Sequence, residues 1–158
     1  MNGQSSFKSS NKPLWLLSVL AIMALVLAAC APAASSTPTA PDTIDVASNP
    51  TLGKILVSGN GMTLYVFTKD SPDQSNCNAS CLANWPALAS SGTPKLGPGV
   101  DASLVGTATL STGEKVITYD HMPLYYFKKD TKPGDTAGQG VGSVWYVVSP
   151  DGKTITKQ

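Results

Sequence analysis

An internal repeat is the feature of this 158-residue chain that most constrains its fold. The segment around GMTLYVFTKD matches the segment around HMPLYYFKKD when the chain is shifted by 60 residues without a gap. Eight residues recur: Gly53, Met62, Leu64, Tyr65, Phe67, Lys69, Asp70 and Trp85 return as Gly113, Met122, Leu124, Tyr125, Phe127, Lys129, Asp130 and Trp145. These identities over 33 positions compare with roughly two expected by chance. The sequence therefore predicts two related structural units.

Each copy is predicted to open with a β-hairpin. The β-branched runs 54–58 (KILVS) and 115–119 (KVITY) lead through turn residues into 64–67 and 124–127. Apolar side chains alternate onto both faces of the second strand, which is typical of a strand held between two layers. We expect the two copies to pack on each other.

After the shared aspartate the copies differ. The first continues with a short helical turn expected near residues 79–84, and the second with a glycine-rich loop. Residues 144–149 and 153–156 are predicted strands because they are β-branched or aromatic and flank a Pro-Asp-Gly turn. The predicted class is mainly β, with one compact domain at 44–158 containing repeat 1 (about 50–90) and repeat 2 (about 110–150).

The N-terminus has the pattern of an export signal over residues 1–29. Lys8 and Lys12 precede an apolar run, 14–27, that is short for a bilayer span. The run ends in Leu-Ala-Ala-Cys, which resembles a bacterial lipoprotein signal and implies a diacylglyceryl group on Cys30. An uncleaved anchor helix, or an ordinary signal with a chance cysteine, is the alternative.

Residues 30–43 are predicted to be the lipidated cysteine and a flexible tether rich in Ala, Pro, Ser and Thr. Acyl chains of the palmitate type on Cys30 would hold the protein on a membrane. We expect it on the outer face of the cytoplasmic membrane or on an outer membrane.

Composition excludes several function classes. All 11 basic residues are lysine, and from Cys30 onward nine Lys face ten Asp plus Glu. Without arginine, a basic excess or a charge run, nucleic-acid binding is not expected. His121 is the single histidine and has no identifiable catalytic partner in the sequence. The chain is therefore predicted not to be an enzyme.

Cys77 and Cys81 are predicted to form a disulfide because an exported chain meets an oxidising compartment. Cβ atoms four residues apart on a regular helix are too distant for a bridge, so Cys77 should precede the helix proper. A c-type haem site would need a histidine where Leu82 stands. A zinc site would need two further ligands.

Asp70 and Asp130 are expected to accept hydrogen bonds from backbone amides as Asx-turns. A calcium site with Asp73 or Asp135 is the alternative.

The six recurring aromatic residues, Tyr65, Phe67, Trp85, Tyr125, Phe127 and Trp145, are interpreted as a shared core. The alternative is an aromatic cleft that holds a ligand such as haem, with a tyrosine as axial ligand. His121 and Met122, with Met62 at the position that corresponds to Met122 in the first copy, are the soft ligands of a candidate copper site with few ligands. His121 is otherwise interpreted as a solvated turn residue.

The motif Tyr-x-(Phe/Trp/Tyr)-x-x-Asp occurs twice, as YVFTKD at 65–70 and YYFKKD at 125–130. With the segments CNASCLANWPAL and KPGDTAGQGVGSVWYVVSPDG, it resembles the bacterial family of secreted repeat lipoproteins of unknown function over roughly residues 50–152. The resemblance implies an exported, usually lipid-anchored module without an established activity.

These observations predict a lipid-anchored, extracytoplasmic module that binds an envelope protein or a small ligand and needs no cofactor. The alternative is an envelope redox or metal-carrier protein that uses copper or haem.

Overall fold

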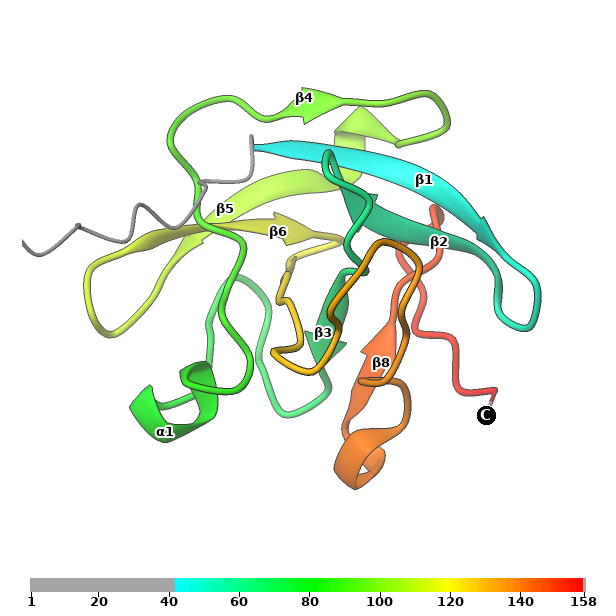
Figure 1. The fold of residues 1–158 in the computed structure, drawn as a ribbon. Coiled ribbons are helices and arrows are strands. Elements are labelled where there is room, and N and C mark those ends of the chain that lie inside the picture. Colours follow the sequence, from blue (N-terminus) through cyan, green and yellow to red (C-terminus); the bar gives the residue numbers. More distant parts are fainter. Residues whose placement is uncertain (1–41, 158) are drawn as a thin grey trace, which may run out of the picture. The chain divides into compact units, whose positions relative to one another are not determined.

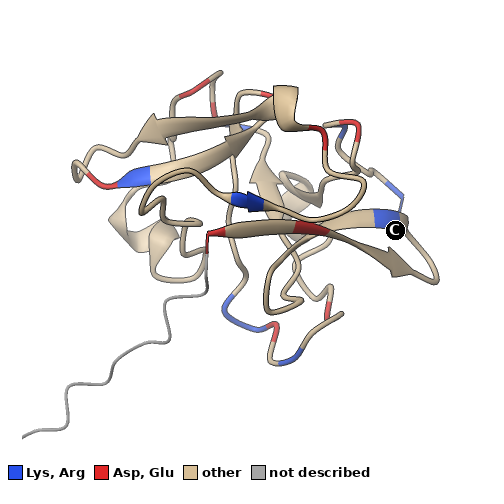
Figure 2. Ribbon diagram, turned by 90° about the horizontal axis from the view of Figure 1, so that it is seen from above, with Lys and Arg blue, Asp and Glu red and all other residues tan. Residues whose placement is uncertain are grey.

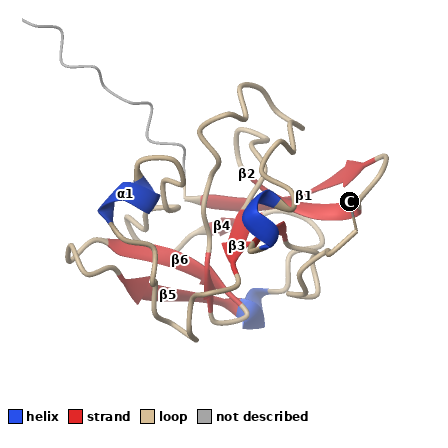
Figure 3. Ribbon diagram, turned by 90° about the horizontal axis from the view of Figure 1, so that it is seen from below, coloured by secondary structure: helices blue, strands red, loops and turns tan. Residues whose placement is uncertain are grey.

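The computed structural model describes residues 42–157, and every structural statement below concerns this part of the chain (Figure 1). The elements, in chain order, are β1 (Thr43–Asn49), β2 (Gly53–Ser58), β3 (Tyr65–Phe67), α1 (Ala79–Leu82), β4 (Lys95–Leu96), the 3-10 helix η2 (Ala102–Leu104), β5 (Val105–Thr109), β6 (Lys115–Tyr119), β7 (Met122–Pro123), the 3-10 helix η3 (Val141–Ser143) and β8 (Trp145–Val147). The mainly β class predicted from the sequence is confirmed. Figure 3 shows how little helix interrupts the strands and loops.

The first copy is built on an antiparallel hairpin of β1 and β2. The hairpin closes where Asn49 pairs with Gly53, and the side chain of Asn49 accepts the N–H groups of Thr51 and Leu52, both at 3.0 Å. Gly53 has φ +81°, a conformation that a residue with a Cβ rarely adopts. β4 lies parallel to β1 on its other side, so the sheet order is β2-β1-β4.

The second copy repeats the hairpin with β5 and β6, and β7 completes a sheet of order β5-β6-β7. A segment of the first copy runs beside β6. The N–H of Ile117 donates to the carbonyl of Leu88, and the N–H of Ser90 donates to that of Lys115, both at 2.8 Å. The first copy therefore contributes backbone to the second copy's sheet.

The spacing between each motif and the strand that precedes it differs by one residue between the copies. Leu64 donates its N–H to the carbonyl of Leu56 at 3.1 Å. Leu124 donates in the same way to Ile117 at 3.0 Å. Leu56 therefore corresponds to Ile117, because the turn after β2 (59–61) is one residue longer than the turn after β6. The ungapped offset of 60 holds for the motif but not for the strands that precede it.

The two copies cross at their motif tyrosines. Tyr65 and Tyr125 exchange backbone hydrogen bonds in both directions, each at 2.9 Å, as an antiparallel bridge. β3 of the first copy also pairs with β8 of the second, and the N–H of Leu56 donates to Val148 O at 2.8 Å. Strands of one copy thus find their partners in the other.

Two apolar clusters lie on opposite faces of these crossing strands, as the alternating pattern predicts. One contains Ile44, Leu56, Leu64, Val66, Leu88, Ile117, Tyr119, Leu124 and Val148. The other contains Ile55, Val57, Tyr65, Cys77, Trp85, Tyr125, Phe127, Trp145 and Val147. The central strands are buried because both of their faces are covered.

Some strands in the structure were not predicted from the sequence, and some predicted strands are shorter than expected. β1 begins at Thr43, the last residue of the predicted tether, and neither β1 nor β5 was expected as a strand. The sequence of β5, VGTAT, has one large apolar side chain, so its pairing with β6 decides its conformation. Of the predicted strand 153–156, only Thr154 forms a bridge, with Val148. Segment 124–127 is likewise not a continuous strand: Tyr125 forms isolated bridges with Tyr65 and Ala87, and Leu124 and Tyr126 each donate a single backbone hydrogen bond.

Charged residues of both signs are scattered over loops and strands (Figure 2). Within residues 42–157, no helix has the length and apolarity to cross a bilayer.

Because each copy completes the other's sheets, neither half should fold by itself. We expect fragments 42–98 and 99–157, divided in an exposed loop, to lack near-ultraviolet circular dichroism when separate. An equimolar mixture should recover the spectrum of the intact domain. A fragment that shows native-like spectra alone would contradict this interdependence.

Candidate functional site

The motif residues form two hydrogen bonds that cross between the copies. The hydroxyl of Tyr65 donates to Asp130 Oδ2 at 2.7 Å. The hydroxyl of Tyr125 donates to Asp70 Oδ2, also at 2.7 Å. Each tyrosine therefore pairs with the aspartate of the other copy, although its own aspartate lies only five positions along the chain.

The second oxygen of each carboxylate closes the loop that follows it. Asp70 Oδ1 accepts the N–H of Asn76 at 2.7 Å, and Asp130 Oδ1 accepts that of Ala137 at 2.9 Å. The sequence correctly predicts that these carboxylates bind backbone amides. The expected two-residue Asx-turn is wrong, because the amides lie six and seven residues further on.

Four aromatic rings form a continuous stack between the tyrosines. Trp85 and Trp145 lie face to face, with ring centroids 3.8 Å apart and planes 1° apart. Phe127 covers the Trp85 end at 4.1 Å, and Phe67 covers the Trp145 end at 4.4 Å. Each phenylalanine therefore stacks on the tryptophan of the other copy.

The tyrosine rings meet this stack edge-on. Tyr65 contacts Trp85 at 5.5 Å between centroids, and Tyr125 contacts Trp145 at 5.2 Å. Because the stack covers both faces of each indole, the tyrosines contact the indole edges, with ring planes 78° apart for Tyr65 and Trp85 and 90° apart for Tyr125 and Trp145. Tyr65, Tyr125 and both tryptophans are buried. This burial agrees with the interpretation of the motif aromatic residues as a shared core.

Each tyrosine hydroxyl also accepts one hydrogen bond. The N–H of Gly138 donates to Tyr65 at 3.2 Å, and the hydroxyl of Ser75 lies 2.7 Å from that of Tyr125. A Cβ on Gly138 would lie 2.7 Å from the Tyr65 ring and 2.9 Å from Trp85. The glycine-rich loop can approach Tyr65 only because position 138 has no side chain.

The first copy has a disulfide where the second has this loop. Cys77 and Cys81 are bridged, with Cα atoms 5.3 Å apart. Cys77 precedes α1, as the sequence predicts, and Asn78 caps the helix by accepting the N–H of Cys81 at 3.0 Å. The bridge fixes one turn beside the aromatic cluster, where Cys77 is buried.

Burial sets the protonation of the two pairs. It raises the pKa of Tyr65 and Tyr125 far above the ordinary value for tyrosine. It also raises the pKa of Asp70 and Asp130, although the hydrogen bonds from the tyrosines oppose that effect. The phenolic protons therefore remain on the tyrosines at neutral pH.

The residues that the sequence suggested for a haem or copper site do not converge on a common point in the structure. The hydroxyls of Tyr65 and Tyr125 are engaged with carboxylates, and the aromatic rings pack against one another. Met62 and Met122 precede the crossing tyrosines by three residues on antiparallel segments, so they lie toward opposite ends of the crossing. In the part of the chain that the structure describes, no three His, Cys, Asp or Glu side chains are grouped as metal ligands.

His121 is an exposed turn residue. Its Nδ1 lies 2.8 Å from Asp73 Oδ2, and its carbonyl accepts the N–H of Asp73 at 2.7 Å. The Asp73 carboxylate raises the pKa of His121. The pair joins the turn after β6 to the loop that follows the first motif.

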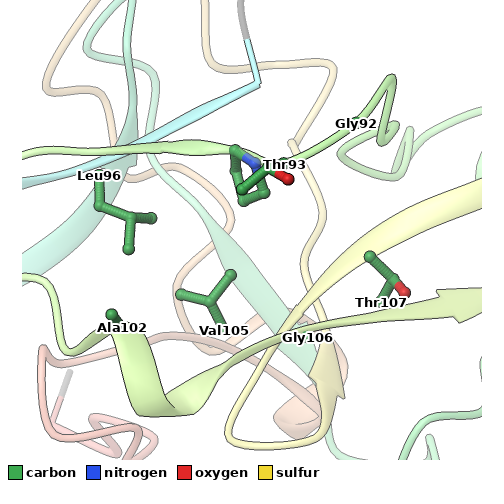
Figure 4. Close-up of a pocket in the computed structure, with 8 residues that line it drawn as sticks. Gly92, Thr93, Leu96, Ala102, Val105, Gly106 and Thr107 are labelled. Carbon is green, nitrogen blue, oxygen red and sulfur yellow. The ribbon is translucent and has the colours of Figure 1, made fainter.

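An apolar groove of about 340 Å³ opens between β4 and β5 (Figure 4). Its lining residues carry no charge and are Gly92, Thr93, Pro94, Leu96, Ala102, Val105, Gly106 and Thr107. The side chains of Leu96 and Val105 face each other across it. Sequence reasoning missed this groove because neither flanking strand was expected.

Both strands beside the groove are sheet edges. β5 pairs only with β6, and β4 pairs only with β1, among the strands of residues 42–157. The N–H of Asp120 donates to Leu104 O, and the N–H of Leu110 donates to Glu114 O. The alternation of antiparallel pairing therefore turns the N–H groups of Thr107 and Thr109 away from β6.

The raised pKa of Asp130 predicts how stability depends on pH. The folded state binds the proton of the Asp130 carboxyl group more tightly than the unfolded state does. The contribution of Asp130 to the free energy of unfolding is therefore largest at acid pH and falls as the pH rises. The wild type should lose stability relative to Asp130→Asn from about pH 4 upward until the folded carboxyl is ionised. Urea titrations of both proteins across this range measure the difference.

Asp101→Asn is the matched control for this prediction. Hydrogen bonds from Ser103 lower the pKa of the exposed Asp101. The wild type should therefore gain stability relative to this variant as pH rises, which is the opposite sign. Equal pH slopes for both variants would contradict the assignment.

Comparison with known proteins agrees with the resemblance found in the sequence. The model of a family described as a secreted repeat of unknown function matches residues 46–89 and 106–149, one copy of the motif in each. No curated protein and no solved structure gives a significant match. The two matched repeats span more than half of the chain, which therefore belongs to this family of secreted repeats and is an exported protein.

Proposed function

We propose that this secreted-repeat protein is anchored to the cell envelope by a lipid on Cys30 and acts as a non-enzymatic binding module. Cys30 and the predicted signal and tether lie outside the described residues apart from the last two tether positions. The anchor is supported by the sequence alone, through the Leu-Ala-Ala-Cys pattern after a short apolar run.

The open groove between two sheet edges is the observation that supports a binding role. The aromatic centre offers little to a partner, because its tyrosine hydroxyls are engaged and its tryptophans are only 6% (Trp85) and 4% (Trp145) exposed. The groove, in contrast, combines an exposed Leu96 with a strand edge whose outward backbone groups have no partner among residues 42–157.

The occupant that fits the groove is an extended peptide segment of an envelope partner. A strand laid beside β5 would satisfy the outward N–H of Thr107, and small apolar side chains would pack against Val105 and Leu96. Because the lining has no charge, shape and backbone pairing would govern selection. Recognition of this kind needs no nucleophile or proton donor.

The anchor predicts a change in location for Cys30→Ala. Without the acceptor thiol, the protein should move from the membrane fraction to the soluble extracytoplasmic fraction, and its mass should lack diacylglycerol. Cell fractionation and intact-mass measurement test this. Cys77→Ala/Cys81→Ala should stay membrane-bound, and an unmodified wild-type Cys30 would overturn the lipid anchor.

The groove predicts a loss of peptide binding for Thr107→Pro. Proline removes the outward donor of an edge strand without removing a bond to β6. Peptides selected from a random dodecamer library against the wild type should bind the variant about fivefold to tenfold more weakly, as expected for one backbone hydrogen bond. Fluorescence anisotropy gives the two dissociation constants.

Thr109→Pro provides the matched control. Its N–H also points away from β6, but the residue does not line the groove. This variant should bind the selected peptides as the wild type does. Selected peptides that bind all three proteins equally, or a selection that yields none, would contradict the proposed use of the groove.

A further inference from the structure

The aromatic centre places two indoles and two phenols in contact. The ring planes of Trp85 and Trp145 are parallel within 1°, and their centroids are 3.8 Å apart, which is face-to-face van der Waals contact. A positive charge on one ring can therefore spread over both, and the adjacent π faces stabilise it electrostatically. The two rings form a single site for loss of an electron.

A tyrosine lies beside each indole of this pair, with its ring nearly perpendicular to the stack. Tyr65 touches Trp85, and Tyr125 touches Trp145, so no electron transfer in the series Tyr65, Trp85, Trp145, Tyr125 exceeds 5.5 Å between ring centroids. The outer faces of the indoles are covered by Phe67 and Phe127. Water therefore has little access to an oxidised ring.

Each tyrosine also has a proton acceptor in place. A phenol that loses an electron must release its proton, and a base helps only within about 2.6–3.2 Å. Asp130 lies 2.7 Å from Tyr65, and Asp70 lies 2.7 Å from Tyr125. The second oxygen of each carboxylate is held by a backbone N–H, so each acceptor is fixed in position.

We propose that this aromatic centre is a one-electron relay that accepts an oxidising equivalent from a radical oxidant, such as carbonate radical anion, and stores it on Tyr65 or Tyr125. The oxidant removes one electron from the indole pair and becomes carbonate. The tyrosine then returns one electron to the indole radical cation while its phenolic proton moves to the aspartate carboxylate. The products are a neutral indole pair, a tyrosyl radical and a neutral carboxyl group.

This activity is independent of the binding groove and of the anchor. The relay lies in the buried cluster around Trp85 and Trp145, whereas the groove lies between β4 and β5. Loss of peptide binding in Thr107→Pro would therefore leave the relay unaffected, and failure of the relay would leave the binding role unaffected.

Pulse radiolysis that generates carbonate radical anion tests the relay. The protein carries Trp15→Phe, so that Trp85 and Trp145 are its only indoles even where residues 1–29 are retained, and is purified from the cell fraction that contains it. We expect an indole radical that converts into a tyrosyl radical at a rate independent of protein concentration. Conversion should be slower in D₂O, because the phenolic proton moves in the same step.

Variants assign the participants. Tyr65→Phe/Tyr125→Phe should abolish the conversion and leave the radical on indole. Asp70→Asn/Asp130→Asn should slow it roughly a hundredfold by removing both proton acceptors. Tyr146→Phe, a partly exposed tyrosine next to Trp145 in sequence but outside these pairs, should behave as the wild type.

Three results would overturn the relay. They are conversion that persists in the Tyr65→Phe/Tyr125→Phe protein, conversion that is lost in Tyr146→Phe, and a wild-type rate that is unchanged in D₂O. The isotope measurement uses the wild-type core, so it decides the question even if an aspartate variant fails to fold.

Discussion

The two hydrogen bonds in which a tyrosine of one copy donates to an aspartate of the other are the interactions on which the rest of the structure depends. Tyr65 binds Asp130 and Tyr125 binds Asp70, each at 2.7 Å within the core or at its edge. A buried polar group left without its partner costs roughly 1–3 kcal/mol, so each copy requires the other. The paired hydroxyls also fix the orientation of the tyrosine rings, against which the tryptophans pack.

The duplicated framework leaves room for the copies to differ in their loops. After Asp70 the chain forms a capped helix and a disulfide, whereas after Asp130 it forms a glycine-rich loop that passes close to Tyr65. Both loops are closed by the same carboxylate-to-amide hydrogen bond. The common core therefore tolerates different loop sequences, because the same aspartate at the start of each loop accepts a backbone N–H six or seven residues later.

The interior and the surface suit different chemistry. The closed centre holds stacked indoles, phenols and carboxylates at short distances, which favours movement of electrons and protons and excludes a bulky ligand. The groove between β4 and β5 is open, uncharged and bordered by unpaired backbone, which favours a peptide strand. The centre depends on the duplication directly, whereas the groove lies where β4, from the segment between the matched repeats, meets β5 at the start of the second repeat.

The sequence by itself determined the duplication, the strands 54–58 and 115–119, the helical turn after Cys77 and the membership of the aromatic core. Each of these follows from local pattern and spacing. Only the tertiary structure decided that Tyr65 pairs with Asp130 and not with nearby Asp70, that VGTAT forms β5, and that two edges border a groove. These features arise from contacts between residues far apart in the chain, and no local pattern records which copy supplies the partner.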